Sequence, residues 1–318
     1  MKVALSILIL LIIISIYFKF NREGFTNNEP DNILTNKNKD KNIYMVRIIG
    51  NCLPYINDPN QNYSNLKYIL DNEPEFPNVK KVWVLNRIVD KNMEDKYIKL
   101  LKQNDKHYET IPFNKKYFST MPVKLTNNSV EDVKANMKQI LYLSNINGAR
   151  NYVIDRFKNQ CEYTMVLDAN IFMNNDSFDK INTVIQDNSE TDYILVPIKR
   201  ISKYTDIEDK NLIDSLENAE PQIIFSKNST LNFNEKIPYG FSNKVELLNL
   251  IGSKGSWNGW KDNERLNVVS RKSNGKNYKH TTCSYFIRLP SKFDGNKHRK
   301  ITQKERTQAV LKLININK

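Results

Sequence analysis

The amino-acid sequence predicts an α/β domain with a largely parallel sheet, preceded by one membrane-spanning helix. Short apolar runs rich in β-branched and aromatic residues alternate along the chain with stretches of helical spacing. Parallel strands need a crossover connection, so this alternation is typical of a parallel sheet with helices on its faces. An uncharged apolar run close to the first Met predicts the membrane helix.

The membrane helix is expected within residues 1–20. Residues 3–18 read VALSILILLIIISIYF, with Lys2 before them and Lys19 after them. Such a helix spans about 24 Å, which a thin membrane tolerates. No small-residue cleavage pattern follows, so we expect an uncleaved anchor rather than a signal peptide. Residues 21–42, rich in Asn, Lys and Asp, then form a flexible tether, and 43–318 form one globular domain.

The composition is that of an ordinary globular protein with more basic than acidic residues. The 318 residues carry a formal net charge of +13, and 40% of them are hydrophobic. The lysines are scattered and no nucleic-acid motif is present, which argues against a nucleic-acid partner. The net positive charge suits a phosphate-bearing ligand or an anionic membrane. It is equally consistent with a lysine-rich solvated surface. Three cysteines without a CxxC pair argue against a cysteine-based zinc site.

The strands are expected where apolar runs end in turn-forming residues. The first run is closed by Gly50-Asn51, and the run before Asp168 is apolar enough to be fully buried. The predicted strands are residues 44–49, 82–85, 108–113, 163–167, 192–197, 222–225 and 282–289.

The helices are expected where apolar residues recur at helical spacing. Leu66, Ile69 and Leu70 give this spacing to the first helix, and Gly252 ends a later one. The predicted helices are residues 61–72, 94–103, 129–142, 149–157, 244–251 and 302–314.

The clearest candidate site is Asp168-Ala169-Asn170, which follows the strand 163–167 directly. In open α/β sheets, ligands bind beyond the carboxyl ends of the strands. Hard cations take oxygen ligands, often one or two carboxylates together with substrate phosphates. We therefore expect Asp168, supported by Asn170, to hold Mg²⁺ or Mn²⁺. The same residues also fit a plain turn at the end of a strand.

The segment before this strand adds groups that suit a nucleotide. Residues 145–151 read NINGARN and enter a helix. Arg150 offers a planar, always-charged fork that matches phosphate, and Asn151 can hydrogen-bond a base or a ribose.

Taken together, 145–151 and Asp168-Ala169-Asn170 resemble the GT-A glycosyltransferases, which carry an Asp-x-Asp-type motif after such a helix. Further segments resemble glycosyltransferase-like proteins of large DNA viruses and microbes. They are RIIGNCLP at 47–54, the helix at 61–74, KVWVLNRI at 81–88, EPQ at 220–222, Tyr-Gly at 239–240 and KVELL at 244–248. The resemblance covers most of residues 44–310.

This resemblance implies a GT-A-like fold that moves a sugar from a nucleotide-diphosphate donor to a glycan or glycoprotein acceptor, with Mn²⁺ or Mg²⁺. The membrane would be a host secretory-pathway membrane or a virion membrane. The expected donor-binding residues are Arg47, Asn51, Asn86, Arg87, Arg150, Asn151 and Lys244. The expected metal ligands are Asp168, Asn170 and His280.

An inverting transfer needs a carboxylate that deprotonates the acceptor hydroxyl. The candidates are Glu220, Asp262 and Glu264. Asp262 follows Trp257 and Trp260 in a segment that resembles the Trp- and Gly-rich acidic segment of some inverting enzymes.

Two positions depart from the family pattern. Asn170 replaces the second acid and removes one negative charge, and Ala169 stands where Gly is common. These departures keep a second hypothesis open: a catalytically degenerate fold that acts as a membrane-tethered glycan-binding or virion-surface protein.

Overall fold

The computed structural model describes most of the expected globular domain. The described residues are 43–54, 56–122, 129–241, 243–258, 268, 271, 276–281, 284–291 and 299–317. The expected anchor (1–20), the tether (21–42) and the candidate bases Asp262 and Glu264 lie outside them. No helix in the described ranges is both long enough and apolar enough to cross a membrane.

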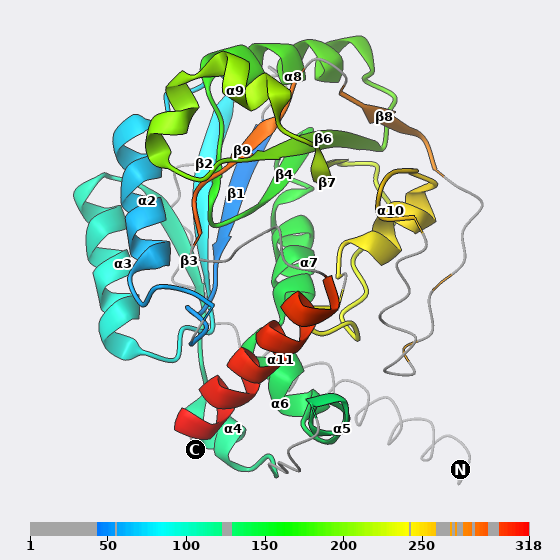
Figure 1. Ribbon diagram of the computed structural model, residues 1–318. Helices are drawn as coiled ribbons and strands as arrows, with labels where there is room; N and C mark the ends of the chain where they lie inside the picture. Colours follow the sequence, from blue (N-terminus) through cyan, green and yellow to red (C-terminus); the bar gives the residue numbers. More distant parts are fainter. Residues whose placement is uncertain are drawn as a thin grey trace, which may run out of the picture.

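One mixed sheet runs through the molecule (Figure 1). The strands of the described residues follow the order β3-β2-β1-β4-β7-β6-β9-β5, with β8 paired to β6. Their bounds are β1 Ile43–Ile49, β2 Val79–Asn86, β3 His107–Ile111, β4 Tyr163–Asp168, β5 Ile171–Phe172, β6 Tyr193–Arg200, β7 Ala219–Ser226, β8 Tyr278–His280 and β9 Phe286–Arg288.

The α/β class expected from the sequence is confirmed, but the sheet is less parallel than expected. Strands β1 to β4 are parallel to one another, whereas β7 runs antiparallel to both β4 and β6. The chain passes from β1 outward to β2 and β3, and then returns to place β4 on the other side of β1. The order in which strands are added to the sheet therefore changes direction between β1 and β4. In open α/β sheets, such a switch point is where ligands bind, beyond the carboxyl ends of the strands.

Helices cover both faces of the sheet. Apolar side chains of α7 and α10 pack on one face, and those of α2, α3 and α8 pack on the other. The bounds are α2 Gln61–Asn72, α3 Lys91–Gln103, α4 Lys115–Ser119, α5 Ser129–Ala135, α6 Met137–Leu143, α7 Ile146–Phe157, α8 Asn175–Asp187, η1 Tyr204–Glu208, α9 Lys210–Ser215, α10 Val245–Ile251 and α11 Arg299–Ile316.

Local signals explain where several helices begin and end. The Asn145 side chain accepts a hydrogen bond from Gly148 N at 2.8 Å and so caps the start of α7. The helix begins at Ile146, three residues earlier than expected. Helix α10 ends at Gly252, which has the left-handed φ of 91° that glycine adopts without strain. The single helix expected at 129–142 is two helices, α5 and α6, which are separated at Asn136.

A smaller core lies beyond the carboxyl ends of β1 and β2. There α5, α6 and α11 pack together with the loop that follows β1, through Leu53, Ile56, Ile140, Val310 and Ile314. Figure 1 shows α11 (red) beside α5 and α6, below the sheet. These helices bring the end of the described chain to the edge where a ligand is expected.

Arg47, which the sequence places among the donor-binding residues, is a core residue in the structure. Its side chain is 0% exposed and forms an ion pair with Glu73 at the end of α2. Arg47 Nε also donates to the carbonyl of Ile171 at 2.9 Å, and Glu73 Oε1 accepts from Met173 N at 3.0 Å. Lys81 Nζ lies 3.3 Å from the other Glu73 oxygen. This buried network joins β1, β2, α2 and β5.

We predict that Glu73→Ala lowers the free energy of unfolding by about 3–5 kcal/mol, because Arg47 and Lys81 would stay buried without their counter-charge. Glu162→Ala, in the exposed Glu162–Lys227 pair, is the matched control and should cost less than about 1 kcal/mol. Urea unfolding of the full-length protein measures both. Equal losses for the two variants would contradict a structural role for the buried network.

Candidate functional site

The carboxylate of Asp168 is held by two arginines and a glutamine. Asp168 is the last residue of β4, at the carboxyl edge of the sheet. Arg150 Nη2, from α7, lies 2.7 Å from Oδ1, and Arg288 Nη2, from the end of β9, lies 2.9 Å from Oδ2. Gln222 Nε2, from β7, donates to Oδ2 at 3.1 Å. Both carboxylate oxygens therefore already accept hydrogen bonds from side chains of the protein.

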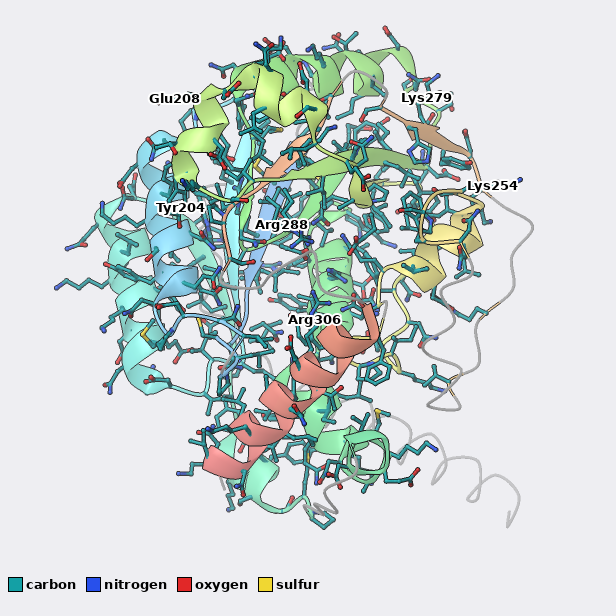
Figure 2. The ribbon with its side chains drawn as sticks, viewed as in Figure 1. Tyr204, Glu208, Lys254, Lys279, Arg288 and Arg306 are labelled. Carbon is teal, nitrogen blue, oxygen red and sulfur yellow. The ribbon has the colours of Figure 1, made fainter. Side chains whose placement is uncertain are left out.

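More positive side chains surround this carboxylate than it can balance. We define the cationic cluster as Arg150, Arg200, Lys244, Arg288 and Arg306. The first four act electrostatically on the carboxylates of Asp168 or Glu220, and Arg306 acts on Arg200. Within the described residues, the four cations Arg150, Arg200, Lys244 and Arg288 thus face the two acids Asp168 and Glu220. Figure 2 shows Arg288 above Arg306, which lies near the middle of α11.

The surroundings shift the pKa values of this cluster strongly. Burial acts to raise the pKa of Asp168, but Arg150, Lys244 and Arg288 outweigh it and hold that pKa well below its usual range. Burial lowers the pKa of Lys244 to about 8, although Asp168 and Glu220 oppose the shift. Burial, followed by the charge of Arg288, lowers the pKa of Arg200 to about 10.

Lys244 is fixed by backbone rather than by a carboxylate. It immediately precedes α10 and is 4% exposed. Its Nζ lies 3.3 Å from the carbonyl oxygen of Pro221 and 3.5 Å from that of Glu220. These two residues belong to β7, so the antiparallel strand presents its carbonyls to the lysine and its Gln222 to Asp168.

The half-buried Glu220 lies within the electrostatic reach of the cationic cluster. Burial acts to raise the pKa of its carboxyl group, but Lys244 and Arg288 oppose it, so the net shift of the pKa is downward. Glu220 is therefore ionised at neutral pH, as a general base must be, although a low pKa weakens it as a base. Its catalytic role stays a prediction.

The arrangement around Asp168 does not fit the expected divalent metal. Both of its oxygens are engaged by Arg150 and Arg288. A divalent ion about 5 Å from a single guanidinium would be repelled by roughly 7 kcal/mol at an effective dielectric constant of about 20. Asn170 is half-buried, and its backbone carbonyl accepts from Leu289 N at 2.9 Å.

His280, the third expected ligand, contacts a different part of the molecule. It lies on the short strand β8, and its Nε2 is 3.1 Å from Ser253 Oγ, just after α10. In the described part of the chain it makes no hydrogen bond or ion pair with the cationic cluster. Across those same ranges, no three His, Cys, Asp or Glu side chains are grouped as a metal site.

Three of the expected donor-binding residues do come together at the carboxyl ends of β1 and β2. Asn51 Nδ2 donates to the carbonyl of Arg87 at 2.8 Å, and Arg87 Nη1 donates to Asn86 Oδ1 at 2.9 Å. The guanidinium of Arg87 lies over the Tyr142 ring, 5.2 Å from its centroid. We call Asn51, Asn86, Arg87 and Tyr142 the Arg87 group.

Arg87 has an unusual backbone conformation for its residue type. Its φ is 47°, in the left-handed region, and its N–H donates to the carbonyl of Ile111 at 2.8 Å. Non-glycine residues in this region cost about 1–3 kcal/mol each and cluster at functional sites. Burial also lowers the pKa of Arg87. The strain and the burial together mark the Arg87 group as a candidate binding site.

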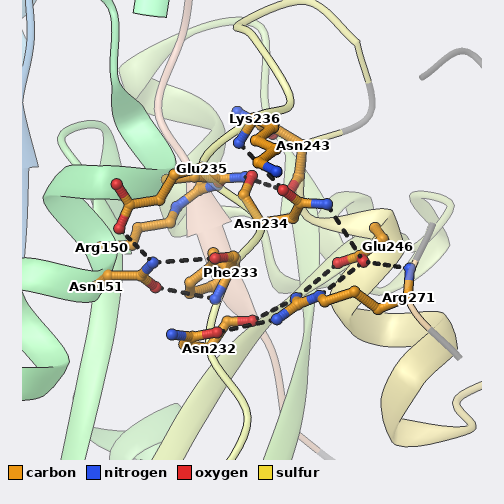
Figure 3. Close-up of polar contacts among 11 residues, drawn as sticks. Arg150, Asn151, Asn232, Phe233, Asn234, Glu235, Lys236, Asn243, Glu246 and Arg271 are labelled. Carbon is orange, nitrogen blue, oxygen red and sulfur yellow. Dashed lines mark hydrogen bonds and ion pairs between the residues drawn. The ribbon is translucent and has the colours of Figure 1, made fainter. Parts of the chain in front are cut away.

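Asn151, another of the expected donor-binding residues, holds a loop in place through its side-chain amide. Its Nδ2 donates to the carbonyl of Phe233 at 3.0 Å and to Glu235 Oε1 at 2.8 Å, while its Oδ1 accepts from Phe233 N at 2.9 Å. Figure 3 shows this contact between α7 and the segment 232–236. The Phe233 ring in turn lies against Arg150, whose guanidinium is 5.1 Å from the ring centroid.

The other side of the same segment is fixed by Glu246 and Arg271 (Figure 3). Arg271 Nη2 lies 2.8 Å from Glu246 Oε2 and 2.6 Å from the carbonyl oxygen of Asn232. The buried Glu246 belongs to α10, so this network links α10 to the segment that supports Arg150.

The sequence argument did not identify Arg200, Gln222, Arg288 and Arg306 as site residues. Arg200 and Arg288 share a local signal, because each ends an apolar β-run, ILVPIKR and YFIR respectively. A charged residue that closes a buried strand lies at a sheet edge, which is where α/β proteins bind ligands. Arg306 lies on α11, a helix whose placement no local pattern reveals.

Comparison with known proteins gives only distant likenesses. No family model matches the chain, and no curated protein matches it. Residues 1–349 of TarS from S. aureus match with a TM-score of 0.41 and 10% identity over 87% of this chain and 65% of that one. The same fragment in complex with UDP matches with a TM-score of 0.41 and 11% identity, over the same shares.

A further likeness is to 4-diphosphocytidyl-2C-methyl-D-erythritol synthase from Anaerococcus prevotii, with a TM-score of 0.33 and 14% identity over 76% of this chain and 89% of that one. The chain thus spans less than two thirds of the TarS fragment it matches. TM-scores this low do not establish a shared fold, and the function proposed below rests on the geometry of the site.

We predict that Asp168→Asn lowers the free energy of unfolding at pH 7 by about 3 kcal/mol, because Arg150 and Arg288 lose their counter-charge. The folded-state pKa of Asp168 is depressed, so its contribution is present above the unfolded pKa of about 3.9 and is lost as the pH falls toward the folded value. The difference between wild type and variant should therefore shrink below about pH 4.

Urea unfolding from pH 7 to pH 3 measures this difference. Asp71→Asn, in the exposed Lys67–Asp71 pair, is the control and should change little at any pH. A gap between wild type and Asp168→Asn that stays constant over this range would contradict the ion-pair assignment.

Proposed function

We propose that the chain is a glycosyltransferase that moves a sugar from a nucleotide-diphosphate donor to a glycan or glycoprotein acceptor. The observation that carries this proposal is the cationic cluster at the carboxyl edge of the sheet, next to the Arg87 group. The mixed sheet with helices on both faces fits the GT-A-like arrangement expected from the sequence.

The position of the two groups suits one extended ligand. Asn51 follows β1 and Asp168 ends β4, so they flank the switch point between these strands. Ligands of open α/β sheets bind in the crevice at such points. In the proposed complex the nucleoside lies near the Arg87 group, and the diphosphate extends toward the cationic cluster.

The chemistry of the cluster suits departure of a diphosphate. When the sugar leaves, negative charge develops on the diphosphate oxygens. Preorganised cations aimed at that position stabilise the developing charge without reorganisation, which is the largest contribution in many enzymes. Arginine adds a planar fork that matches phosphate oxygens in two hydrogen bonds.

The acceptor side of the proposal has two candidate bases. Glu220 lies beside Lys244 and Arg288, close to where the diphosphate would bind. Asp262 lies outside the described residues and stays a candidate from the sequence. In either case the carboxylate would take the proton of the acceptor hydroxyl as the new glycosidic bond forms.

The membrane anchor at 1–20 and the tether at 21–42 remain part of the proposal. They would hold the domain close to a host secretory-pathway membrane or a virion membrane, where glycoprotein acceptors are displayed. Protection of the globular domain from added protease in sealed membrane vesicles, lost on addition of detergent, would test this arrangement.

The proposal is tested by incubating the full-length protein with a panel of UDP-, GDP- and CDP-sugars and measuring release of the nucleoside diphosphate. We expect turnover of at least one donor. Glu220→Gln should lower kcat by about a hundredfold or more, because removal of a general base typically costs that much, while the affinity for the product nucleotide stays unchanged.

Lys227→Ala, on the exposed surface, serves as the control and should keep wild-type turnover. Absence of turnover across the whole panel, with retained binding to glycans, would instead support a glycan-binding protein. Equal turnover by Glu220→Gln and wild type would remove Glu220 from the mechanism and leave Asp262 as the candidate base.

A further inference from the structure

We infer that the cationic cluster binds the donor diphosphate directly and takes the place of a divalent cation. This inference rests on the proposed function and adds to it the way in which the diphosphate is held. It follows from three side chains that carry positive charge without full compensation: Arg288, Arg200 and Lys244.

Arg288 is buried but incompletely satisfied. It is 9% exposed, and its Nη2 donates to Asp168. Its Nε is buried and has no hydrogen-bond partner in the described structure. Buried donors are almost always paired in folded proteins, and an unpaired one is costly. A phosphate oxygen beside Asp168 would supply the missing acceptor.

Arg200 is directly opposite Arg288 in the sheet. The two residues are register partners on the parallel strands β6 and β9. Like charges opposite each other on neighbouring strands destabilise a sheet. No hydrogen bond or ion pair to the Arg200 side chain occurs within the described ranges. The pair of arginines is thus arranged for an anion bound between them rather than for stability.

Lys244 adds a third charge that no carboxylate contacts within ion-pair distance in the described residues. In that part of the chain, the two β7 carbonyls are the groups that hold its Nζ. Removing an ammonium from water is costly unless an anion compensates for it. Because Asp168 is already shared between Arg150 and Arg288, an anionic ligand is the natural counter-charge for Arg200 and Lys244.

The same arrangement explains why Asp168 does not offer its carboxylate to a metal ion. A metal ion on a diphosphate supplies positive charge and fixes the phosphate oxygens. Here arginine and lysine side chains already supply that charge, and Asp168 orients two of the arginines instead of binding a cation. The replacement of the second acid by Asn170 agrees with this change of role.

Isothermal titration calorimetry tests the inference with inorganic pyrophosphate and with UDP as probes on the full-length protein. Each titration is run with EDTA and again with added Mn²⁺. We expect both probes to bind in EDTA, with a Kd that Mn²⁺ does not lower. Binding that requires Mn²⁺ and disappears in EDTA would overturn the inference.

Substitution of Arg200 separates ligand binding from a structural role. We expect Arg200→Gln to weaken pyrophosphate binding by at least about tenfold and to raise the melting temperature of the unliganded protein, because it relieves repulsion with Arg288. Lys227→Gln, which removes one exposed cation, is the control and should change neither quantity. A lower melting temperature together with unchanged binding would mark Arg200 as structural and contradict the inference.

The two proposals can fail separately. Pyrophosphate binding in EDTA without turnover of any nucleotide sugar would leave the anion site standing and remove the glycosyltransferase. Turnover that depends on Mn²⁺, together with loss of pyrophosphate binding in EDTA, would keep the enzyme and remove the metal-free site.

Discussion

The site depends on the charge balance around one carboxylate. Asp168 at the end of β4 pairs with Arg150 and Arg288, and these two contacts use both of its oxygens. Within the described residues, Arg200 and Lys244 then have no carboxylate in ion-pair contact, so positive charge exceeds negative charge in this part of the site. Such an excess is unfavourable in the free protein and favourable once an anion binds. The same interaction thus organises the site and limits what it can bind.

The fold explains why so many charges meet at one place. Asp168 lies at the switch point between β1 and β4. The antiparallel strand β7 brings Gln222 and the carbonyls that hold Lys244 to the same edge of the sheet. The parallel pairing of β6 with β9 adds two arginines at matching positions. The network of Asn151, Phe233 and Glu246 keeps α7 and α10 in place around them.

The sequence predicted the parts of this arrangement that depend on local patterns. The α/β class, most strands, a helix before β4 and the position of Asp168 at the end of a strand all follow from apolar periodicity and turn residues. The partner Arg288 is 120 positions from Asp168 in the chain, and no local pattern encodes such a contact. The contacts of Arg47 with Glu73 and of Asn151 with Phe233 could not be predicted for the same reason, since the sequence beside a polar residue does not show which distant group that residue contacts.

The members of the cationic cluster are spread from α7 to α11, and this spacing has a consequence for biosynthesis. Arg306 lies on the last helix of the described chain, which packs against α5 and α6. A ribosome-bound chain that still lacks this helix has neither the complete cluster nor the small core beneath it. In the proposed complex, donor binding therefore needs a chain that has folded through α11.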